Sequence, residues 1–269
     1  MTPSMPEQEI EEFIQRSGWN PDQEIQPRED LEKPEENEDN VIVFSIGKEI
    51  RVLDYDYQDY SFKKRGQLVN TLCSHKGNLY ESWEDGIIAE SQYCKPIGMR
   101  DVMFPTMAMW SHNNKIYDAG LYNSIVETVT NKMMGRRDHW GFAITTHKGR
   151  LIDGGAYKGI RDTLTGEKLV DTQDTVRGLC SIAGTLYDAR FNKEESHKIY
   201  ESLSDDVIQQ RPRIITSLCS MNGRLYDCGQ YRMILDTFDN RVIHYASSTI
   251  FDMCTHPRAY FVEKGVLPP

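Results

Sequence analysis

The chain of 269 residues contains no run of 18 apolar residues, so its sequence offers no segment that would cross a membrane as a helix. Its first residues lack the basic start and apolar stretch of a secretory signal, and we expect none. Basic charge is also scarce, because 41 acidic residues stand against 31 basic ones, a net charge of −10. A nucleic-acid binder needs a basic surface for phosphates, so we expect neither a nucleic-acid nor a membrane partner.

Catalytic signatures are absent as well. The sequence has no Gly-x-Ser-x-Gly elbow, no His-Glu-x-x-His pair and no Walker-type loop. Its one glycine-rich stretch, residues 154–159, lies between two expected strands rather than between a strand and a helix, so it predicts a turn. We expect no cofactor. An enzyme can still assemble its site from scattered residues, so catalysis stays open but is disfavoured.

What the sequence does have is a short sequence motif that recurs six times. The fifth copy reads Cys-Ser-Met-Asn-Gly-Arg-Leu-Tyr-Asp, and successive copies start 37, 35, 35, 39 and 35 residues apart. A fixed period in this range predicts stacked or radially repeated units. We call the first residue of each copy its landmark; the landmarks are Cys73, Trp110, Thr145, Cys180, Cys219 and Cys254.

The spacing of turn residues within a unit indicates strands rather than helices. In the fifth unit, β-branched and apolar residues at 214–220 end at the turn Asn222-Gly223, residues 224–228 end at Gly229, and residues 233–237 end at Asp239-Asn240. Breaks every eight to ten residues leave strands of the usual length and no room for a helix. Four short strands therefore fit in each unit.

Four-stranded units arranged in a ring form a β-propeller. At Gly47-Lys48-Glu49-Ile50-Arg51-Val52-Leu53-Asp54 the chain resembles the third strand of a WD40 repeat, with Leu53 where tryptophan is usual. Residues 41–269 resemble the WD40-like propellers in outline, although the repeat is shorter and no Gly-His or Trp-Asp pair recurs.

The number of blades follows from counting strands. Six isoleucines mark the centres of third strands, and the six landmarks mark first strands. The first of these third strands has no first strand before it, however, and the last first strand has no clear third strand after it. Residues 41–44 and 260–262 both qualify as the missing second strand. We predict six blades, one of them closed between the two termini, with seven as the alternative; the isoleucines are Ile50, Ile88, Ile125, Ile160, Ile199 and Ile234.

Charge and cysteine are distributed unevenly. Residues 1–40 hold 13 acidic and three basic residues, and therefore the whole net charge, so we expect an acidic disordered tail before a neutral domain at 41–269. Four of the six cysteines are landmarks, which predicts small core side chains, and Cys94 and Cys228 have no obvious partner. We expect a reduced, cytoplasmic and monomeric protein.

Carboxylates and histidines recur with the unit. The second strands end in Glu81, Asp118, Asp153, Asp188 and Asp227. We expect them to be structural and to accept hydrogen bonds from first-strand hydroxyls, from the third-strand Thr128, Thr163 and Thr237, or from glycine amides, while a cation-binding ring stays open. His75, His112, His147 and His256 follow their landmarks by two residues, and copies on separate blades cannot converge on one zinc ion. We expect no metal site.

The resemblance also implies a binding face. In WD40-like propellers the loops between second and third strands, and between a fourth strand and the next first strand, share the face that usually binds. Aromatic residues and arginine dominate interface energetics. The residues predicted to bind are Arg137, Asp138, Trp140, Tyr122, Tyr157, Phe191, Tyr231 and Arg213, although the three tyrosines could instead pack between blades.

Two functions follow from this sequence. The first is a non-enzymatic scaffold or recognition module that binds a protein or peptide on the loop-rich face. The alternative is an enzyme or binder of a small molecule or glycan at the mouth of the central channel.

Overall fold

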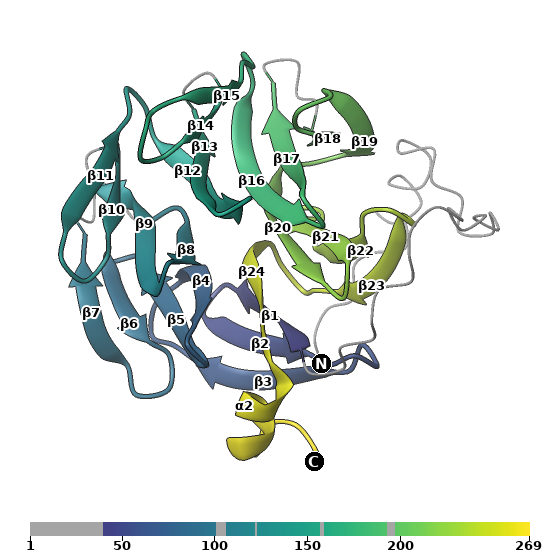
Figure 1. Ribbon diagram of the computed structural model, residues 1–269. Coiled ribbons are helices and arrows are strands. Elements are labelled where there is room, and N and C mark those ends of the chain that lie inside the picture. The colour runs from purple at the N-terminus through teal and green to yellow at the C-terminus, as the bar shows by residue number, and fades with distance from the viewer. Residues whose placement is uncertain (1–39, 101–105, 122, 157–158, 193–196) are drawn as a thin grey trace.

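The structure is a computed structural model that describes residues 40–100, 106–121, 123–156, 159–192 and 197–269 (Figure 1). The predicted acidic tail lies outside the described residues except for Asn40, which begins the first strand. No helix in these ranges is long and apolar enough to span a membrane.

Six four-stranded antiparallel sheets stand in a ring, so the predicted six-bladed propeller is confirmed (Figure 1). Blade 1 consists of β24 (Ile250–Pro257), β1 (Asn40–Ile46), β2 (Glu49–Leu53) and β3 (Asp59–Lys64), and blade 2 of β4 (Val69–His75), β5 (Asn78–Trp83), β6 (Ile87–Glu90) and β7 (Lys95–Met99). Blade 3 consists of β8 (Met109–His112), β9 (Lys115–Leu121), β10 (Ser124–Glu127) and β11 (Lys132–Arg136), and blade 4 of β12 (Gly141–His147), β13 (Arg150–Gly155), β14 (Ile160–Asp162) and β15 (Lys168–Val170). Blade 5 consists of β16 (Thr175–Ile182), β17 (Thr185–Phe191), β18 (His197–Glu201) and β19 (Asp206–Arg211), and blade 6 of β20 (Ile215–Met221), β21 (Arg224–Gly229), β22 (Met233–Asp236) and β23 (Arg241–Tyr245).

The first strand of each unit is the innermost strand of its blade. Neighbouring inner strands contact one another around the whole ring, in the order β24, β4, β8, β12, β16 and β20. Each inner strand begins on the side of the loops that join consecutive blades, and all but β24 end at a tight turn to the second strand. The turn at Asn222-Gly223 has φ of +53° and +72°, as expected for a two-residue hairpin turn that favours Asn-Gly.

Blade 1 is closed between the two ends of the chain, as the strand count predicts. The C-terminal β24 pairs with β1 in register from Asn40 opposite Pro257 to Ser45 opposite Asp252. Since β1 fills the position beside β24, the alternative second strand at 260–262 is wrong. Residues Arg258–Glu263 form the helix α2 instead, and its Phe261 is fully buried against Val41 and Val43.

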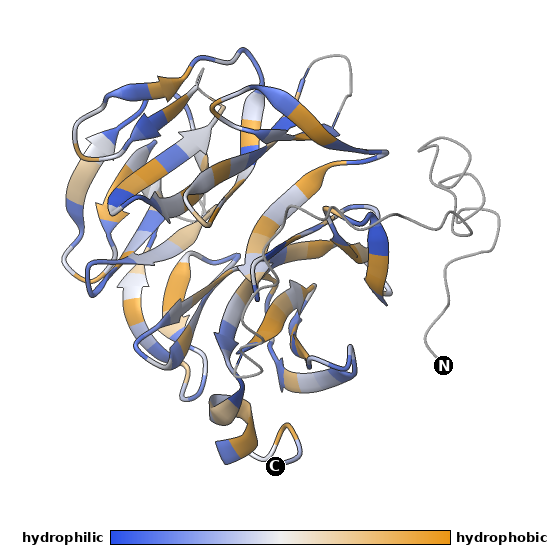
Figure 2. Ribbon diagram, turned by 45° about the vertical axis from the view of Figure 1, so that its right-hand side comes forward, coloured by the Kyte–Doolittle hydropathy of each residue, from blue (hydrophilic) through white to orange (hydrophobic). Residues whose placement is uncertain are grey.

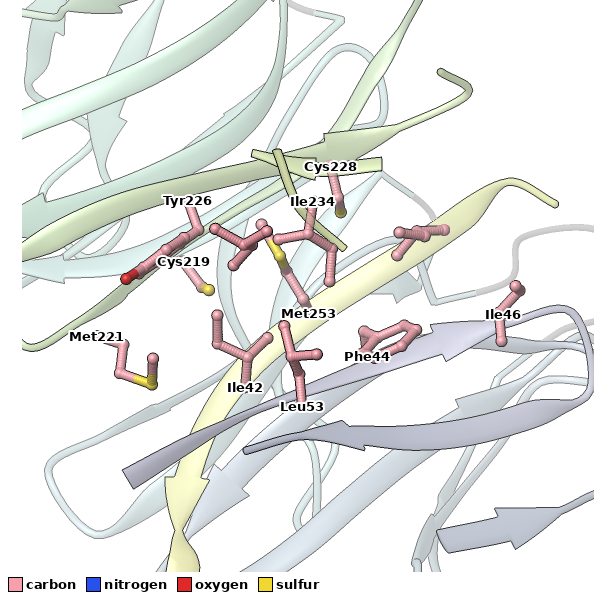
Figure 3. Packing of buried hydrophobic residues seen from close by; sticks show 12 residues of the cluster. Ile42, Phe44, Ile46, Leu53, Cys219, Met221, Tyr226, Cys228, Ile234 and Met253 are labelled. Carbon is pink, nitrogen blue, oxygen red and sulfur yellow. The ribbon is translucent and has the colours of Figure 1, made fainter. Parts of the chain in front are cut away.

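The hydrophobic core is divided into clusters that lie at the junctions between blades. Strands carry most of the hydrophobic residues and turns most of the hydrophilic ones (Figure 2). One large cluster joins blades 6 and 1, where Phe44 and Leu53 meet Met253, Cys219 and Ile234 (Figure 3). The landmark cysteines are buried and all six cysteines, which lie in the described ranges, are unpaired, as predicted.

Candidate functional site

The repeated carboxylates form buried ion pairs across the junctions between blades. Arg100, which directly follows β7 in blade 2, donates from Nε to Oδ1 of Asp118 in blade 3 at 2.7 Å and from a terminal nitrogen to Oδ2 at 2.5 Å. The hydroxyl of Thr128 adds a third hydrogen bond to the same carboxylate at 2.7 Å. Both charged side chains are fully buried. A buried charge needs such complete pairing, so Asp118 is structural.

The same arrangement recurs at other junctions. Arg137 of blade 3 pairs with Asp153 of blade 4, and Arg211 of blade 5 pairs with Asp227 of blade 6 at 2.7 and 2.6 Å. Arg65 lies 2.7 Å from Glu81 at the junction of blades 1 and 2. The predicted threonine donors are confirmed in these blades, with Thr163 on Asp153 and Thr237 on Asp227, both at 2.8 Å.

Burial raises the pKa of the Asp118 and Glu81 carboxyls, and their arginine partners offset part of that rise. Burial lowers the pKa of Arg211, but the charge of Asp227 and its hydrogen bonds raise it, and the net pKa lies above the usual value. In the described part of the chain, no three side chains of His, Cys, Asp or Glu are grouped as metal ligands. The carboxylates are occupied by arginine and threonine, which supports the structural interpretation over the cation ring.

Two junctions lack the inter-blade arginine. β15 ends at Val170 without one, and Asp188 of blade 5 instead pairs with Arg190, two residues later on its own strand. In blade 1, Phe44 stands at the position of the carboxylate. It lies opposite Met253, just as Asp227 lies opposite Leu218 in blade 6. An apolar contact therefore replaces the ion pair at the closing blade.

The repeated histidines join blades at the opposite ends of the inner strands. Each shares a hydrogen bond from Nδ1 with a hydroxyl on the next inner strand; the pairs are His75 with Ser111 (2.8 Å), His112 with Thr146 (3.0 Å), His147 with Ser181 (2.9 Å) and His256 with Ser74 (2.8 Å). These hydroxyls were predicted as possible donors to the carboxylates, and the structure assigns them to histidine instead. Burial lowers the pKa of all four histidines, that of His256 to about 4.

The predicted binding residues divide between the interior and the loop-rich face. The side chain of Arg137 is 4% exposed and paired with Asp153, and Tyr231 is buried with its hydroxyl donating to Asp227. Phe191 is half-buried and stacks on His197 with a centroid distance of 5.0 Å. Tyr122 and Tyr157 lie outside the described residues.

Three of the predicted residues are exposed on loops that join blades. Asp138 and Trp140 belong to the loop between β11 and β12, and Arg213 to the loop between β19 and β20. Trp140 is 47% exposed and meets Phe142 edge-on at 6.3 Å. Both loops lead into inner strands, so they open on the same face, at junctions two blades apart.

The channel that these loops surround contains a cavity of about 390 Å³, lined by residues of all six inner strands. Most of the lining is apolar. Its only charged members in the described part of the chain are Arg177 of β16 and Asp252 of β24. This volume lies within the range of small-ligand pockets.

A ring of β-bulges shapes the mouth of this channel. The pairing of first and second strands skips one residue near the start of the inner strand in five blades, and the skipped residues are Asn70, Phe142, Arg177, Thr216 and Phe251. Each lies three residues before its landmark, and Met107 is the equivalent in blade 3. Bulges re-aim side chains, and all but Asn70 of these six line the cavity.

The two charged groups in the cavity differ in how they are satisfied. Asp252 accepts a hydrogen bond from the backbone nitrogen of Leu72 at 2.8 Å, and burial raises its pKa to about 6. The guanidinium of Arg177 lies 4.1 Å from the ring centroid of Phe142, and its buried Nε has no hydrogen-bond partner among the described residues. Burial lowers the pKa of Arg177.

Comparison with known proteins identifies the fold. No protein-family model matches the sequence. No curated protein matches it either. Among solved structures, the WD40 β-propeller domain of Doa1 matches with a TM-score of 0.53 and 12% identity, over 80% of this chain and 81% of that one. The computationally designed Ika8 protein matches with a TM-score of 0.45 and 12% identity, over 81% of this chain and 78% of that one. The chain therefore has the fold of a six-bladed β-propeller, similar to that of WD40 domains.

Proposed function

We propose that this propeller is a non-enzymatic recognition module that binds a protein or peptide on its loop-rich face, with the channel mouth at the centre of the contact. A propeller of this kind is consistent with a protein-interaction module. The observation that supports the proposal is a division among the repeated positions. Most of the recurring carboxylates and arginines, and the recurring histidines, form contacts between blades, whereas the residue three positions before the landmark varies in chemistry among the blades.

Variation at one position of an otherwise regular unit is what a binding surface requires. The residues three positions before the landmarks include a cation, a hydroxyl, an amide, a thioether and two phenyl rings, and five of the six line one cavity. Trp140 and Arg213 add an exposed aromatic ring and an exposed cation on the loops around it. Such residues dominate the energy of protein interfaces.

Affinity capture with substituted propellers tests this proposal. Trp140→Ala together with Arg213→Ala should abolish capture of the partner while the melting temperature stays unchanged. Each residue would contribute about 1–3 kcal/mol if it is an interface anchor. Tyr93→Ala, an equally aromatic and more exposed residue at the turn between β6 and β7, is the matched control and should leave capture intact. Capture that survives the double substitution would contradict the proposal.

A second candidate function is binding or turnover of a small molecule in the channel. The cavity and the raised pKa of Asp252 favour it, since a carboxyl that titrates near pH 6 can act as a general acid or base. Asp252→Asn should remove turnover in that case and leave partner capture unchanged if the recognition function holds.

We also propose that the protein works as a monomer in the cytoplasm. The six unpaired cysteines support a reducing compartment. The pairing of β24 with β1 supports a ring that needs no strand from a second chain. Size-exclusion chromatography with light scattering would contradict the monomer if it gave twice the mass of 31.1 kDa.

A further inference from the structure

Arg177 differs from the arginines that hold the blades together. Arg100, Arg137, Arg190 and Arg211 each form a salt bridge with a buried carboxylate. Arg177 lines the cavity instead, stacks on Phe142, and has no carboxylate within salt-bridge distance among the described residues.

The incomplete pairing of Arg177 is costly, because the residue is half-buried and its enclosed Nε has no hydrogen-bond partner among the described residues. A buried charge is normally matched by a counter-charge or by hydrogen bonds, and stacking on an aromatic ring compensates by only about 0.5–2 kcal/mol. The lowered pKa of Arg177 has burial as its cause, in keeping with a guanidinium that has lost water without gaining a carboxylate. A ligand that supplies an anion would complete the site.

The surroundings of Arg177 define what kind of anion fits. Phe142, Phe251 and Met107 come from three other blades, each three residues before its landmark, and line the same cavity. The hydroxyl of Thr216 is already used, because it donates to the carbonyl oxygen of Ile250 at 2.7 Å. The site therefore offers one cation beside apolar and aromatic side chains.

The charge balance favours a single negative charge on the ligand. Asp252, two inner strands away, is the other charged residue of the lining, and its carboxylate is bound to the backbone of β4. A dianionic phosphate would need more than one cation and would be repelled by Asp252. A carboxylate matches one guanidinium in charge and in bidentate geometry.

We propose that the channel mouth binds a carboxylate of the peptide partner, either an acidic side chain or the C-terminal group, against the guanidinium of Arg177. The apolar part of the same residue packs among Phe142, Phe251 and Met107. The identification of the ligand as a peptide rests on the proposed function, whereas the carboxylate site itself does not.

Two small molecules of the same shape test the site without the partner. Phenylacetate and phenylacetamide carry the same ring, but only phenylacetate has a carboxylate. Titration calorimetry of the full chain should show phenylacetate binding at least tenfold more tightly than the amide. Equal affinities, or no heat from phenylacetate up to about 10 mM, would overturn the proposal.

Substitution of the arginine then assigns the effect to this residue. Arg177→Met should remove the preference for the carboxylate, and Arg177→Lys should retain part of it. Arg136→Met removes an exposed arginine at the end of β11 and should bind phenylacetate as the native chain does. A carboxylate preference that persists in Arg177→Met, or that disappears in Arg136→Met, would contradict the site.

Peptides distinguish the two sources of the carboxylate. A peptide that ends in phenylalanine should lose affinity at least tenfold on C-terminal amidation if the terminus binds. If an acidic side chain binds, a Glu→Gln change should have that effect instead. Failure of both, with capture still sensitive to Trp140 and Arg213, would sink the carboxylate site and leave the recognition face standing.

Discussion

Arg190 pairs with Asp188 from within the same strand, with Nε 2.5 Å from Oδ2, whereas the equivalent carboxylates of blades 2, 3, 4 and 6 receive their arginine from the preceding blade. Three of those blades have glycine two residues after the carboxylate, at Gly120, Gly155 and Gly229. A Cβ on Gly155 would lie 2.1 Å from the carbonyl oxygen of Trp140, so a side chain is excluded there. In blade 5 this position holds Arg190, which supplies the cation that the end of β15 lacks.

An arginine placed in the preceding blade, blade 4, should be able to take over the role of Arg190. Arg190→Gly leaves Asp188 buried without its cation, and we expect a loss of about 3–5 kcal/mol in the free energy of unfolding. Thr172 occupies the equivalent of Arg100, because each lies two residues after the partner of the third-strand isoleucine: Ile160 lies opposite Val170, and Ile88 lies opposite Gly98. Adding Thr172→Arg to Arg190→Gly should therefore restore part of the loss in urea unfolding. A double variant no more stable than Arg190→Gly would contradict the equivalence.

Asp153 should behave as a structural carboxylate. Asp153→Asn removes the charge that Arg137 and Thr163 bind, and we expect about 2–4 kcal/mol less stability. The paired replacement Asp153→Leu with Arg137→Met leaves no charge buried, so it should cost less than the sum of the two single changes. Urea unfolding of the four proteins gives the coupling directly. Additive costs would show that the pair is not coupled.

Stability should fall as the solution is acidified below pH 6.5. The folded pKa of His256 is about 4 and its unfolded value is 6.5, so the unfolded chain binds the proton first between these values. Stability is then complete above pH 6.5 and decreases by up to about 3 kcal/mol as pH falls to 4. His256→Gln keeps a hydrogen-bonding group near Ser74 and should flatten this decrease, measured by urea unfolding at several pH values.

Asp252 provides a control of opposite sign. Its folded pKa of about 6 lies above the ordinary value of 3.8, so the folded state gains the proton first and stability rises as pH falls through 6. Asp252→Asn should remove this gain and steepen the acid loss. An unchanged slope in His256→Gln, together with an unchanged slope in Asp252→Asn, would contradict both assignments.

Closure of the ring should depend on the C-terminal strand. Deletion of residues 250–269 removes β24 and α2, exposing the edge of β1 and the apolar faces of blades 1, 2 and 6. Unpaired strand edges and exposed core favour unfolding and aggregation. We expect the shortened chain to lose its cooperative thermal transition. A transition that keeps its width and shifts by only a few degrees would contradict the role of β24.

The fold could be predicted from the sequence because the repeat occurs six times. The period, the turns at Asn222-Gly223 and its equivalents, and the opening of the chain on a third strand together predict six blades with one closed between the ends. The helix at 258–263 could not be predicted, because residues 260–262 are apolar enough for a strand and only the pairing of β1 with β24 excludes one.

The site was less predictable, for a physical reason. Thr128, Thr163 and Thr237 were predicted as candidate donors and lie on the carboxylate's own blade, but the arginines come from the blade before. A signal for them exists, since Arg65, Arg137 and Arg211 each precede their carboxylate by 16 residues. The role of Arg177 depends on a bulge and on the absence of a carboxylate beside it, and neither is written in the spacing of residues.

The arginines that recur at the blade junctions hold a buried carboxylate, whereas Arg177 does not, and a single comparison tests this difference. Arg137→Met and Arg177→Met make the same chemical change, and their free energies of unfolding can be measured side by side in urea. We predict a loss of about 3–5 kcal/mol for Arg137→Met, because Asp153 is left unpaired, and no loss for Arg177→Met, because no described carboxylate depends on it. Equal losses would contradict the account, since Arg177 would then hold the blades together as Arg137 does.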